Sequence, residues 1–374
     1  MGRMGRMEPI TCQSRFRRAW QALGWGAATF VVAQLALAVG FHRWLPESRD
    51  PAYGAKLKQL HERLRQSPTP PELVVMLGSS RTAYGFDGSL LEADLSADAG
   101  KPAIVYNLGR MGGGPIAESI YLQRLLADGI RPTLLLVEVP PYILSREGSA
   151  HEAESLQVGP LDPKERDLLH AFGEEAEEGL PRWVDRSVPV YSRRRVILYK
   201  LTPSLLGRDV RSTCRLQWWR QLNASGWSPL ERPGSHQEIE DAHMRSAGPL
   251  IAKLQGVALG NDLPACRALE HVVQLAQHER IPVALVVMPE GPRLRQAYPE
   301  NSWERIWAYL QDFGTRHHCP VINGRDWVEG KHFADPDHLG PTGAKQFTER
   351  LGREHLRPIW GRLHHGGNGP LAAQ

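Results

Sequence analysis

The chain has 374 residues, of which 41% are hydrophobic and 23% charged, proportions typical of an ordinary globular protein. Its formal net charge of +4 resides in the first 18 residues, where five arginines accompany a single glutamate. A nucleic-acid-binding protein carries its basic excess on the folded domain, so this pattern argues against that class. No internal repeat is visible in the sequence, which argues against a solenoid or a propeller.

The segment after the basic tail, residues 1–18, is predicted to be a transmembrane anchor. Residues 19–41 contain no charged side chain, and roughly 20 apolar residues span a bilayer as a helix. Trp20 and Trp44 lie near the ends of the run, where interfacial aromatic residues are common. The arginines favour a cytoplasmic N-terminus, so we expect a single-pass protein of the inner (cytoplasmic) membrane whose later residues are exported to the periplasm. The alternatives are a signal peptide cleaved near residues 36–38 and a buried helix of a soluble domain, which the arginine asymmetry disfavours.

Residues 42–71 are expected to form a stalk or linker that contains a short amphipathic helix and ends in the proline-rich residues 67–71. Beyond it, short apolar runs typical of buried parallel strands occupy residues 73–77, 103–106, 134–137, 283–287 and 320–322. Helical periodicity is found at residues 115–128, 265–278 and 303–313, and again from near Gly343. This alternation predicts an α/β fold, a parallel sheet with helices on both faces.

The stretch from 144 to 254 does not follow this alternation. It is rich in Arg, Trp, Gly and Pro, and it includes Trp218, Trp219 and the arginines 193–195. We therefore expect an insertion or lid at 144–254 within a domain formed by residues 72–143 and 255–360, with a flexible tail at 361–374. The aromatic and basic residues could bind an anionic glycan, and a structural helical cap with a solvated charged face is the alternative.

The cysteines leave the redox compartment open. Cys12 precedes the apolar segment, whereas Cys214, Cys266 and Cys319 follow it, and three thiols cannot all pair internally. We expect unpaired cysteines, with a Cys214–Cys266 or a Cys266–Cys319 bridge as alternatives, and the spacing fits no zinc pattern.

Two segments at predicted strand ends contain candidate oxyanion donors. Residues 78–82, Gly-Ser-Ser-Arg-Thr, follow the first strand, and functional residues of an open parallel sheet gather at such carboxyl ends. A sharp turn there can present a hydroxyl and direct backbone N–H groups at a developing oxyanion. Residues 107–114, Asn-Leu-Gly-Arg-Met-Gly-Gly-Gly, follow the second strand and could provide a further donor. They match neither a dinucleotide fingerprint nor a P-loop, and plain polar or flexible turns are the alternative for both segments.

A third segment, residues 333–343, precedes the last helix and contains Asp335 and His338. A serine nucleophile needs a base, and the base needs an orienting carboxylate. Residues three apart lie on one side of a helical turn, so His338 could take the proton of Ser80 while Asp335 fixes its tautomer. The alternatives are a surface turn that caps the last helix and a metal site, although the sequence offers no convincing third ligand.

Together these segments resemble the SGNH hydrolase superfamily over residues 73–143 and 264–356. The resemblance implies a flavodoxin-like three-layer α/β/α fold without a cofactor or a metal. It aligns Gly78-Ser79-Ser80 with the first block, which selects Ser80 as nucleophile, and Asp335 and His338 with the last block. Residues 107–112 resemble the second block, with Gly112 in the oxyanion position. Asn107, Ser79 and Arg81 are the further candidates for oxyanion or substrate binding.

The chain departs from the family pattern at the third block. The usual Gly-x-Asn-Asp provides an oxyanion donor after the third strand, whereas this chain has residues 138–142, Glu-Val-Pro-Pro-Tyr. Asn261 is not a substitute, because no sheet strand precedes it and Asp262 is expected to cap the following helix. A complete oxyanion hole is therefore in doubt, with the Ser80 and Gly112 N–H groups as its remaining donors.

The Gly-Ser-Ser block, the proline-rich third block and the apolar segment are similar to a narrower group, which includes the teichoic-acid D-alanylation protein and the alginate-type O-acetylation proteins. This resemblance implies extracytoplasmic transfer of an acyl group, often acetyl, to or from a cell-surface glycan, with a membrane-bound O-acyltransferase as a possible partner. Ser80 would accept the acyl group and a sugar hydroxyl would resolve the ester. The alternatives are an esterase, in which water resolves it, and a non-catalytic glycan-binding assembly subunit.

Overall fold

The computed structural model describes residues 12–44, 50–157, 161–174, 202, 221–231 and 236–365. The chain divides into two units. Residues 1–49 and 178–215 form the first unit, in which helix α1 (Cys12–Trp44) is described. Residues 50–177 and 216–374 form the second unit, which contains the sheet and all three candidate segments.

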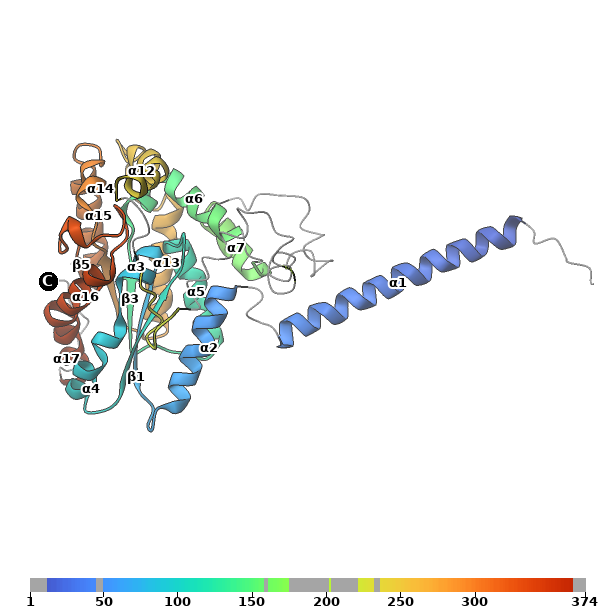
Figure 1. Cartoon of the computed structure of the whole chain (residues 1–374), viewed down its shortest axis with the longest axis horizontal. Coiled ribbons are helices and arrows are strands. Elements are labelled where there is room, and N and C mark those ends of the chain that lie inside the picture. Colours follow the sequence, from blue (N-terminus) through green and yellow to red (C-terminus); the bar gives the residue numbers. More distant parts are fainter. Residues whose placement is uncertain are drawn as a thin grey trace, which may run out of the picture. The chain divides into compact units, whose positions relative to one another are not determined.

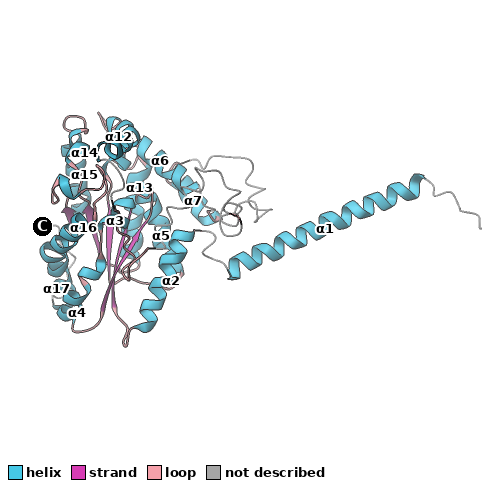
Figure 2. Ribbon diagram, in the orientation of Figure 1, coloured by secondary structure: helices cyan, strands magenta, loops and turns pink. Residues whose placement is uncertain are grey.

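Five parallel strands form a single sheet in the order β2-β1-β3-β4-β5 (Figure 2). They are β1 (Glu72–Gly78), β2 (Ala103–Gly109), β3 (Leu134–Glu138), β4 (Val283–Val287) and β5 (Val321–Asn323). The α/β prediction is confirmed, and each strand overlaps the apolar run from which it was predicted. The order 2-1-3-4-5 is a doubly wound arrangement whose switch point lies between β1 and β3.

Helices cover both faces of the sheet. Successive side chains of β1 accordingly belong to two different hydrophobic clusters, one on each face. Leu73, Val75 and Leu77 contribute to one cluster, which also includes residues of α2, α5, α13 and α15. Val74 and Met76 contribute to the other, which includes residues of α4, α16 and α17. Figure 1 shows α2 and α5 on one side of β1, and α4, α16 and α17 on the other. A strand buried on both faces explains why its sequence is continuously apolar.

The main helices of these layers are α2 (Pro51–Gln66), α4 (Glu92–Ala99), α5 (Pro115–Ala127), α13 (Pro264–His278), α15 (Ser302–Arg316), α16 (Pro341–Leu351) and α17 (Arg357–His365). Shorter elements are α3 (Ser80–Gly85), η2 (Gly88–Leu90), η3 (Pro141–Leu144), α14 (Pro292–Gln296), η6 (Gly330–His332) and η7 (Gly352–Leu356). Helices α5, α13 and α16 all begin with proline, whose fixed φ and missing N–H suit a first helical turn. Asp262 does not cap α13, because Leu263 is the N-cap residue and no side chain bonds there.

The predicted membrane anchor is wrong. In the described part of the chain, no helix has both the length and the apolar character needed to cross a bilayer. Helix α1 has 33 residues and does not meet this combined requirement. The inner-membrane, single-pass and periplasmic assignments were derived from that anchor, and they are withdrawn with it.

The expected stalk is also different in the structure, because α2 belongs to the folded unit. Tyr53 and Leu60 are buried in the hydrophobic cluster that covers one face of the sheet. Lys56 is only 1% exposed, and its Nζ donates to the carbonyl oxygens of Asn107 and Gly109 at 2.8 and 3.0 Å. A helix bonded in this way to the end of β2 supports the turn that follows the strand.

The expected insertion at 144–254 also contributes to the globular unit. Its described helices are α6 (Arg146–Gln157), α7 (Pro163–Ala171) and α12 (His236–Ala252). The Ser225 carbonyl accepts the backbone N–H of Asn107 at 2.8 Å, so residues 221–231 lie against β2. Trp218, Trp219, the arginines 193–195, Cys214 and the tail beyond residue 365 lie outside the described residues. Cys266 and Cys319 are buried free thiols.

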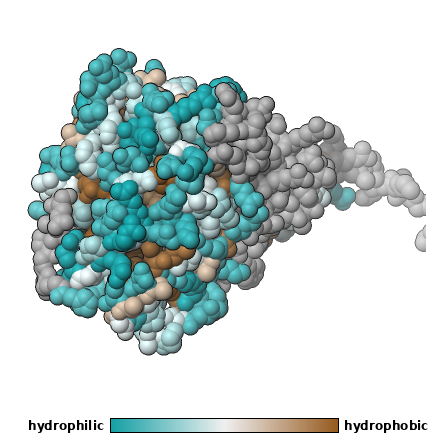
Figure 3. All heavy atoms as spheres, turned by 60° about the vertical axis from the view of Figure 1, so that its left-hand side comes forward, coloured by the Kyte–Doolittle hydropathy of each residue, from teal (hydrophilic) through white to brown (hydrophobic). Residues whose placement is uncertain are grey.

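Figure 3 shows one face of the molecule with α14 to α17 turned toward the viewer. Hydrophilic residues cover most of this face, and smaller hydrophobic areas lie between them.

Candidate active site

Ser80 lies directly beyond the carboxyl end of β1, beside the switch point of the sheet. It is the first residue of α3, and Ser79 is the N-cap, with its Oγ accepting the backbone N–H of Arg81 at 3.0 Å. A Cβ at Gly78 would collide with the side chain of Thr82. Glycine is therefore needed to turn the chain sharply from strand to helix, and this turn leaves Ser80 partly exposed.

His338 and Asp335 come from the loop between η6 and α16 and meet Ser80 in a continuous chain of hydrogen bonds. His338 Nε2 is 2.7 Å from Ser80 Oγ, and its Nδ1 is 2.7 Å from Asp335 Oδ2. Asp335 Oδ1 accepts the backbone N–H groups of Asp337 and His338, each at 2.9 Å. The other carboxylate oxygen is thereby directed at the imidazole, the arrangement that a general base requires.

Neighbouring charges set the protonation of this pair. Burial lowers the pKa of His338, but the carboxylates of Asp335 and Asp337 outweigh it, and the net shift is upward. Burial raises the pKa of Asp335, but His338 and His243 outweigh it, and the net shift is downward. An ionised Asp335 therefore faces an imidazole whose protonated form is stabilised, as a base that takes up a proton needs.

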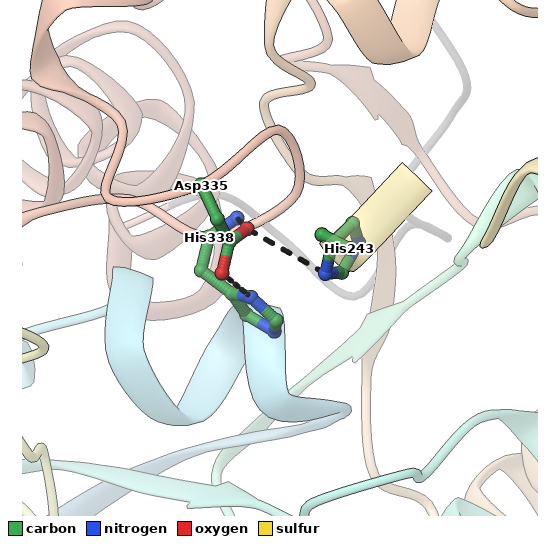
Figure 4. Close-up of side chains that lie close together, drawn as sticks. All are labelled: His243, Asp335 and His338. Atoms are coloured by element: carbon green, nitrogen blue, oxygen red, sulfur yellow. Dashed lines mark hydrogen bonds and ion pairs between the residues drawn. The ribbon is translucent and has the colours of Figure 1, made fainter. Parts of the chain in front are cut away.

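Two rings enclose His338. Tyr84, from α3, and His243, from α12, each meet it edge-on, with ring centroids 5.5 Å away. Figure 4 shows His243, Asp335 and His338 facing one another. His243 Nδ1 is 3.9 Å from Asp335 Oδ1, and its Nε2 is 3.6 Å from Asp337 Oδ2. Within the described residues, these three side chains form the one group whose donor atoms all lie within 4.8 Å of one another, close enough to consider a shared metal ion.

Glu138, at the end of β3, holds the turn that presents Ser80. Its carboxylate accepts the backbone N–H and the hydroxyl of Ser79 at 2.8 and 2.9 Å. It also accepts the hydroxyl and the backbone N–H of Thr82 at 2.6 and 3.2 Å. Residues 138–142, where the SGNH resemblance led us to look for an oxyanion-donating asparagine, instead provide a carboxylate that satisfies donors on both sides of Ser80.

Arg81 does not reach a substrate from its position. Its side chain is 1% exposed, and Nη2 donates to the carbonyl oxygens of Met288 and Pro289 at 2.8 and 2.9 Å. Its Nε is 3.2 Å from Asp337 Oδ1, and Glu138 and Glu290 lie slightly further away. A buried guanidinium that pairs with carboxylates at the end of β3, just after β4 and beside His338 ties these strand ends to the loop that carries Asp335 and His338.

Asn107 is likewise occupied inside the fold. It lies within β2 and is fully buried. Its Nδ2 donates to the carbonyl oxygens of Thr82 and Phe86, both at 2.7 Å, and its Oδ1 accepts the N–H of Gly109 at 2.9 Å. Because both amide hydrogens are used, Asn107 fixes α3 against β2 and has no hydrogen left to donate to an oxyanion.

Gly112 lies in the turn between β2 and α5 and has a φ of 63°, a conformation that glycine adopts readily. Helix α6 holds this turn, because Ser155 Oγ donates to the Gly112 carbonyl at 2.6 Å and the Ser155 carbonyl accepts Arg110 Nη2 at 3.0 Å. Among the described contacts, the N–H groups of Ser80 and Gly112 have no partner. They remain the candidate oxyanion donors.

Sequence reasoning missed Glu138, Asp337 and His243. Glu138 directly follows an apolar run, and an acidic residue at the carboxyl end of a buried strand was an available signal. Asp337 lies within the Asp-Pro-Asp-His segment and could have been noted there. His243 carried no local signal, since only the packing of α12 brings it to the site.

No family model matches the chain, and no curated protein matches it in sequence.

Proposed function

We propose that the protein is a serine acyl-group enzyme of the SGNH type, with Ser80 as nucleophile, His338 as general base and Asp335 as the carboxylate that orients the base. The observation that carries the proposal is the unbroken chain from Ser80 Oγ through both ring nitrogens of His338 to Asp335, with 2.7 Å at each link. The position of Ser80 at the switch point of a doubly wound sheet, where ligands of such folds bind, gives independent support.

The reaction proceeds in two steps. Ser80 Oγ attacks the acyl carbonyl carbon while its proton passes to His338 Nε2. The tetrahedral oxyanion collapses, and the leaving oxygen departs with the proton from Nε2. A hydroxyl acceptor then attacks the acyl-serine ester, His338 takes up the acceptor's proton, and Ser80 is released when that proton returns to Oγ.

The acceptor in this proposal is a sugar hydroxyl, and the product is an O-acylated, in the first instance O-acetylated, glycan. This assignment rests on the resemblance of the Gly-Ser-Ser block and the proline-rich third block to glycan O-acylation proteins. Water as acceptor would make the same site an esterase, and the experiment below separates the two outcomes.

The test uses the full chain with a fluorophosphonate probe, which phosphonylates an activated serine. Mass spectrometry of the labelled peptide is expected to place the adduct on Ser80. Ser80→Ala and His338→Ala are expected to abolish labelling. Ser79→Ala is the matched control, because it removes the adjacent hydroxyl and the cap of α3 but leaves the nucleophile in place. In this variant we expect slower labelling, because Glu138 and the Arg81 N–H each lose a partner on the turn, but the adduct should still lie on Ser80.

Turnover of p-nitrophenyl acetate in the presence and absence of oligosaccharides then identifies the acceptor. Acetylated sugar as product supports transfer, whereas free acetate at an unchanged rate supports the esterase. A folded chain in which Ser80 is never labelled would overturn the proposal.

A further inference from the structure

His243 lies beside His338 and Asp335 but has no role in the proposed mechanism. His243 lies on α12, inside the segment expected as an insertion, and its side chain is 20% exposed. Its two nitrogens face two different carboxylates, with Nδ1 directed at Asp335 and Nε2 at Asp337. Nε2 is buried and has no hydrogen-bond partner among the described residues.

Asp335 lies between two imidazoles, as Figure 4 shows. His338 Nδ1 is 2.7 Å from Asp335 Oδ2, and His243 Nδ1 is 3.9 Å from Asp335 Oδ1. Two imidazole nitrogens and a carboxylate oxygen form a donor set that suits zinc and related divalent transition metals better than magnesium or calcium.

The surroundings of His243 also match those of a metal-binding histidine. Such a histidine usually donates its second ring N–H to a carboxylate, which fixes the tautomer and turns the other nitrogen to the metal. Asp337 is in that position, 3.6 Å from His243 Nε2. Asp337 is itself held in place, because it accepts the Tyr142 hydroxyl at 2.8 Å and pairs with Arg81 at 3.2 Å.

We propose that His243, Asp335 and His338 bind a zinc ion through His243 Nδ1, His338 Nδ1 and a carboxylate oxygen of Asp335. Tetrahedral zinc with bonds of about 2.0–2.2 Å separates its ligand atoms by about 3.3–3.6 Å. The candidate atoms all lie within 4.8 Å of one another, so zinc binding requires an inward movement of α12 by about an ångström and a lengthening of the 2.7 Å contact between His338 Nδ1 and Asp335 Oδ2 by about half an ångström. The fourth position is left for water.

Zinc at this position would switch off acyl transfer, a consequence that rests on the proposed function. His338 binds zinc through the lone pair of Nδ1, so its single proton moves from Nδ1 to Nε2. In that tautomer Nε2 donates to Ser80 Oγ and cannot accept the serine proton. Asp335 is at the same time withdrawn from its role in orienting the base. The site would therefore exist either as a catalytic triad or as a zinc complex.

Zinc binding is tested directly by equilibrium dialysis of the full chain, freed of metal with a chelator, against Zn²⁺. Co²⁺ provides a second readout, because a tetrahedral site with nitrogen ligands gives visible absorption bands. We expect His243→Ala to weaken binding at this site at least tenfold and to remove the cobalt bands. His243→Asn should do the same, which guards against an effect on the packing of α12.

Two controls separate this site from other histidines and from catalysis. His364→Ala removes an imidazole that lies 3.2 Å from Glu72 at the start of β1, whereas Ser80 follows the end of that strand, and it should leave the zinc affinity within about twofold. Ser80→Ala removes no ligand and should still bind zinc, so the metal test gives a result even if the proposed function fails. Unchanged zinc affinity in both His243 variants would overturn the proposal.

The inhibitory consequence is measured as the ratio of fluorophosphonate labelling rates with and without saturating Zn²⁺. This ratio should fall at least tenfold in the wild-type chain and stay near one in His243→Ala. A wild-type chain that binds zinc through His243 but is labelled equally fast in its presence would overturn the switch. A chain that is not labelled even without zinc would contradict the proposed function and leave the dialysis result standing.

Discussion

Glu138 Oε2 accepts a hydrogen bond of 2.8 Å from the backbone N–H of Ser79, the residue that immediately precedes the candidate nucleophile. The same carboxylate group takes three further donors, the hydroxyl of Ser79 and the hydroxyl and N–H of Thr82. It is fully buried, so water does not compete for these donors. The strand-to-helix turn at Ser80 is thus fixed from β3, a different strand from the one that precedes it.

Glu138→Gln is expected to disrupt this turn. The amide keeps the shape of the side chain but presents an NH₂ group to donors, which leaves at least one buried N–H or hydroxyl unsatisfied at a cost of about 1–3 kcal/mol. We expect a loss of that size in urea unfolding and at least a tenfold fall in fluorophosphonate labelling. Exposed Glu154→Gln is the control and should change neither quantity. Wild-type labelling in Glu138→Gln would show that the turn holds Ser80 without this carboxylate.

Asp335→Asn tests the orienting carboxylate. Asparagine can still accept the N–H groups of Asp337 and His338 through Oδ1, so the loop should keep its conformation. Its NH₂ group would face His338 Nδ1 and force the tautomer that carries its proton on Nε2, which cannot accept the serine proton. By the behaviour of such triads we expect labelling to fall by a factor of about 10⁴. Labelling within tenfold of wild type, with an unchanged unfolding midpoint, would contradict a triad.

Glu152→Gln probes a buried carboxyl on α6. Burial raises the pKa of Glu152 from 4.5 to about 7, although the backbone N–H groups at the start of α5 act in the opposite direction. The folded chain thus holds this proton more tightly than the unfolded chain, so stability is lost as the pH rises from 4.5 to 7. The loss amounts to about 3 kcal/mol above pH 7.

Glutamine does not ionise, so this part of the pH dependence should vanish in Glu152→Gln. Relative to wild type, the variant should gain about 3 kcal/mol in free energy of unfolding between pH 4.5 and pH 8. Urea unfolding at several pH values measures the difference between the two chains, which cancels the titration of other groups. A difference that stays constant across this range would contradict the raised pKa.

Gly109→Ala tests the close approach between β2 and α3. A Cβ at Gly109 would collide with the backbone of Ala83 and lie 2.8 Å from the carbonyl oxygen of Ser79. Overpacking of this kind costs about 1–3 kcal/mol, and we expect a matching loss of stability together with slower labelling, because α3 carries Ser80. Gly361→Ala, in α17, is the matched control. A Cβ there meets no atom within 4 Å, so stability should rise by about 0.5–1 kcal/mol.

Local sequence patterns were sufficient to predict the strands and helices. They were not sufficient to predict where a helix lies, in a membrane, in a stalk or on the sheet. The apolar runs at 73–77 and 134–137 predicted β1 and β3 because a strand buried on both faces is apolar at consecutive positions. The run at 19–41 predicted a membrane-spanning helix and was wrong. Absence of charge identified a helix there, but it did not measure how apolar that helix is. The prediction of a stalk was wrong for a related reason. The apolar stripe of α2 is compatible with an isolated helix and equally with a helix packed on a sheet, and α2 packs on the sheet.

The sequence by itself determined the identity of the turn at Ser80, the Asp335–His338 pair and the alternation that makes an α/β sheet, because each depends on residues close together along the chain. Tertiary structure alone decided the strand order, which brings Ser80 Oγ to 2.7 Å from His338 Nε2. It also decided the partnership of Glu138 with the turn and the arrival of His243 beside Asp335. These contacts join segments separated by long stretches of chain, and they form only when the two hydrophobic clusters pack helices from all of those segments onto one sheet.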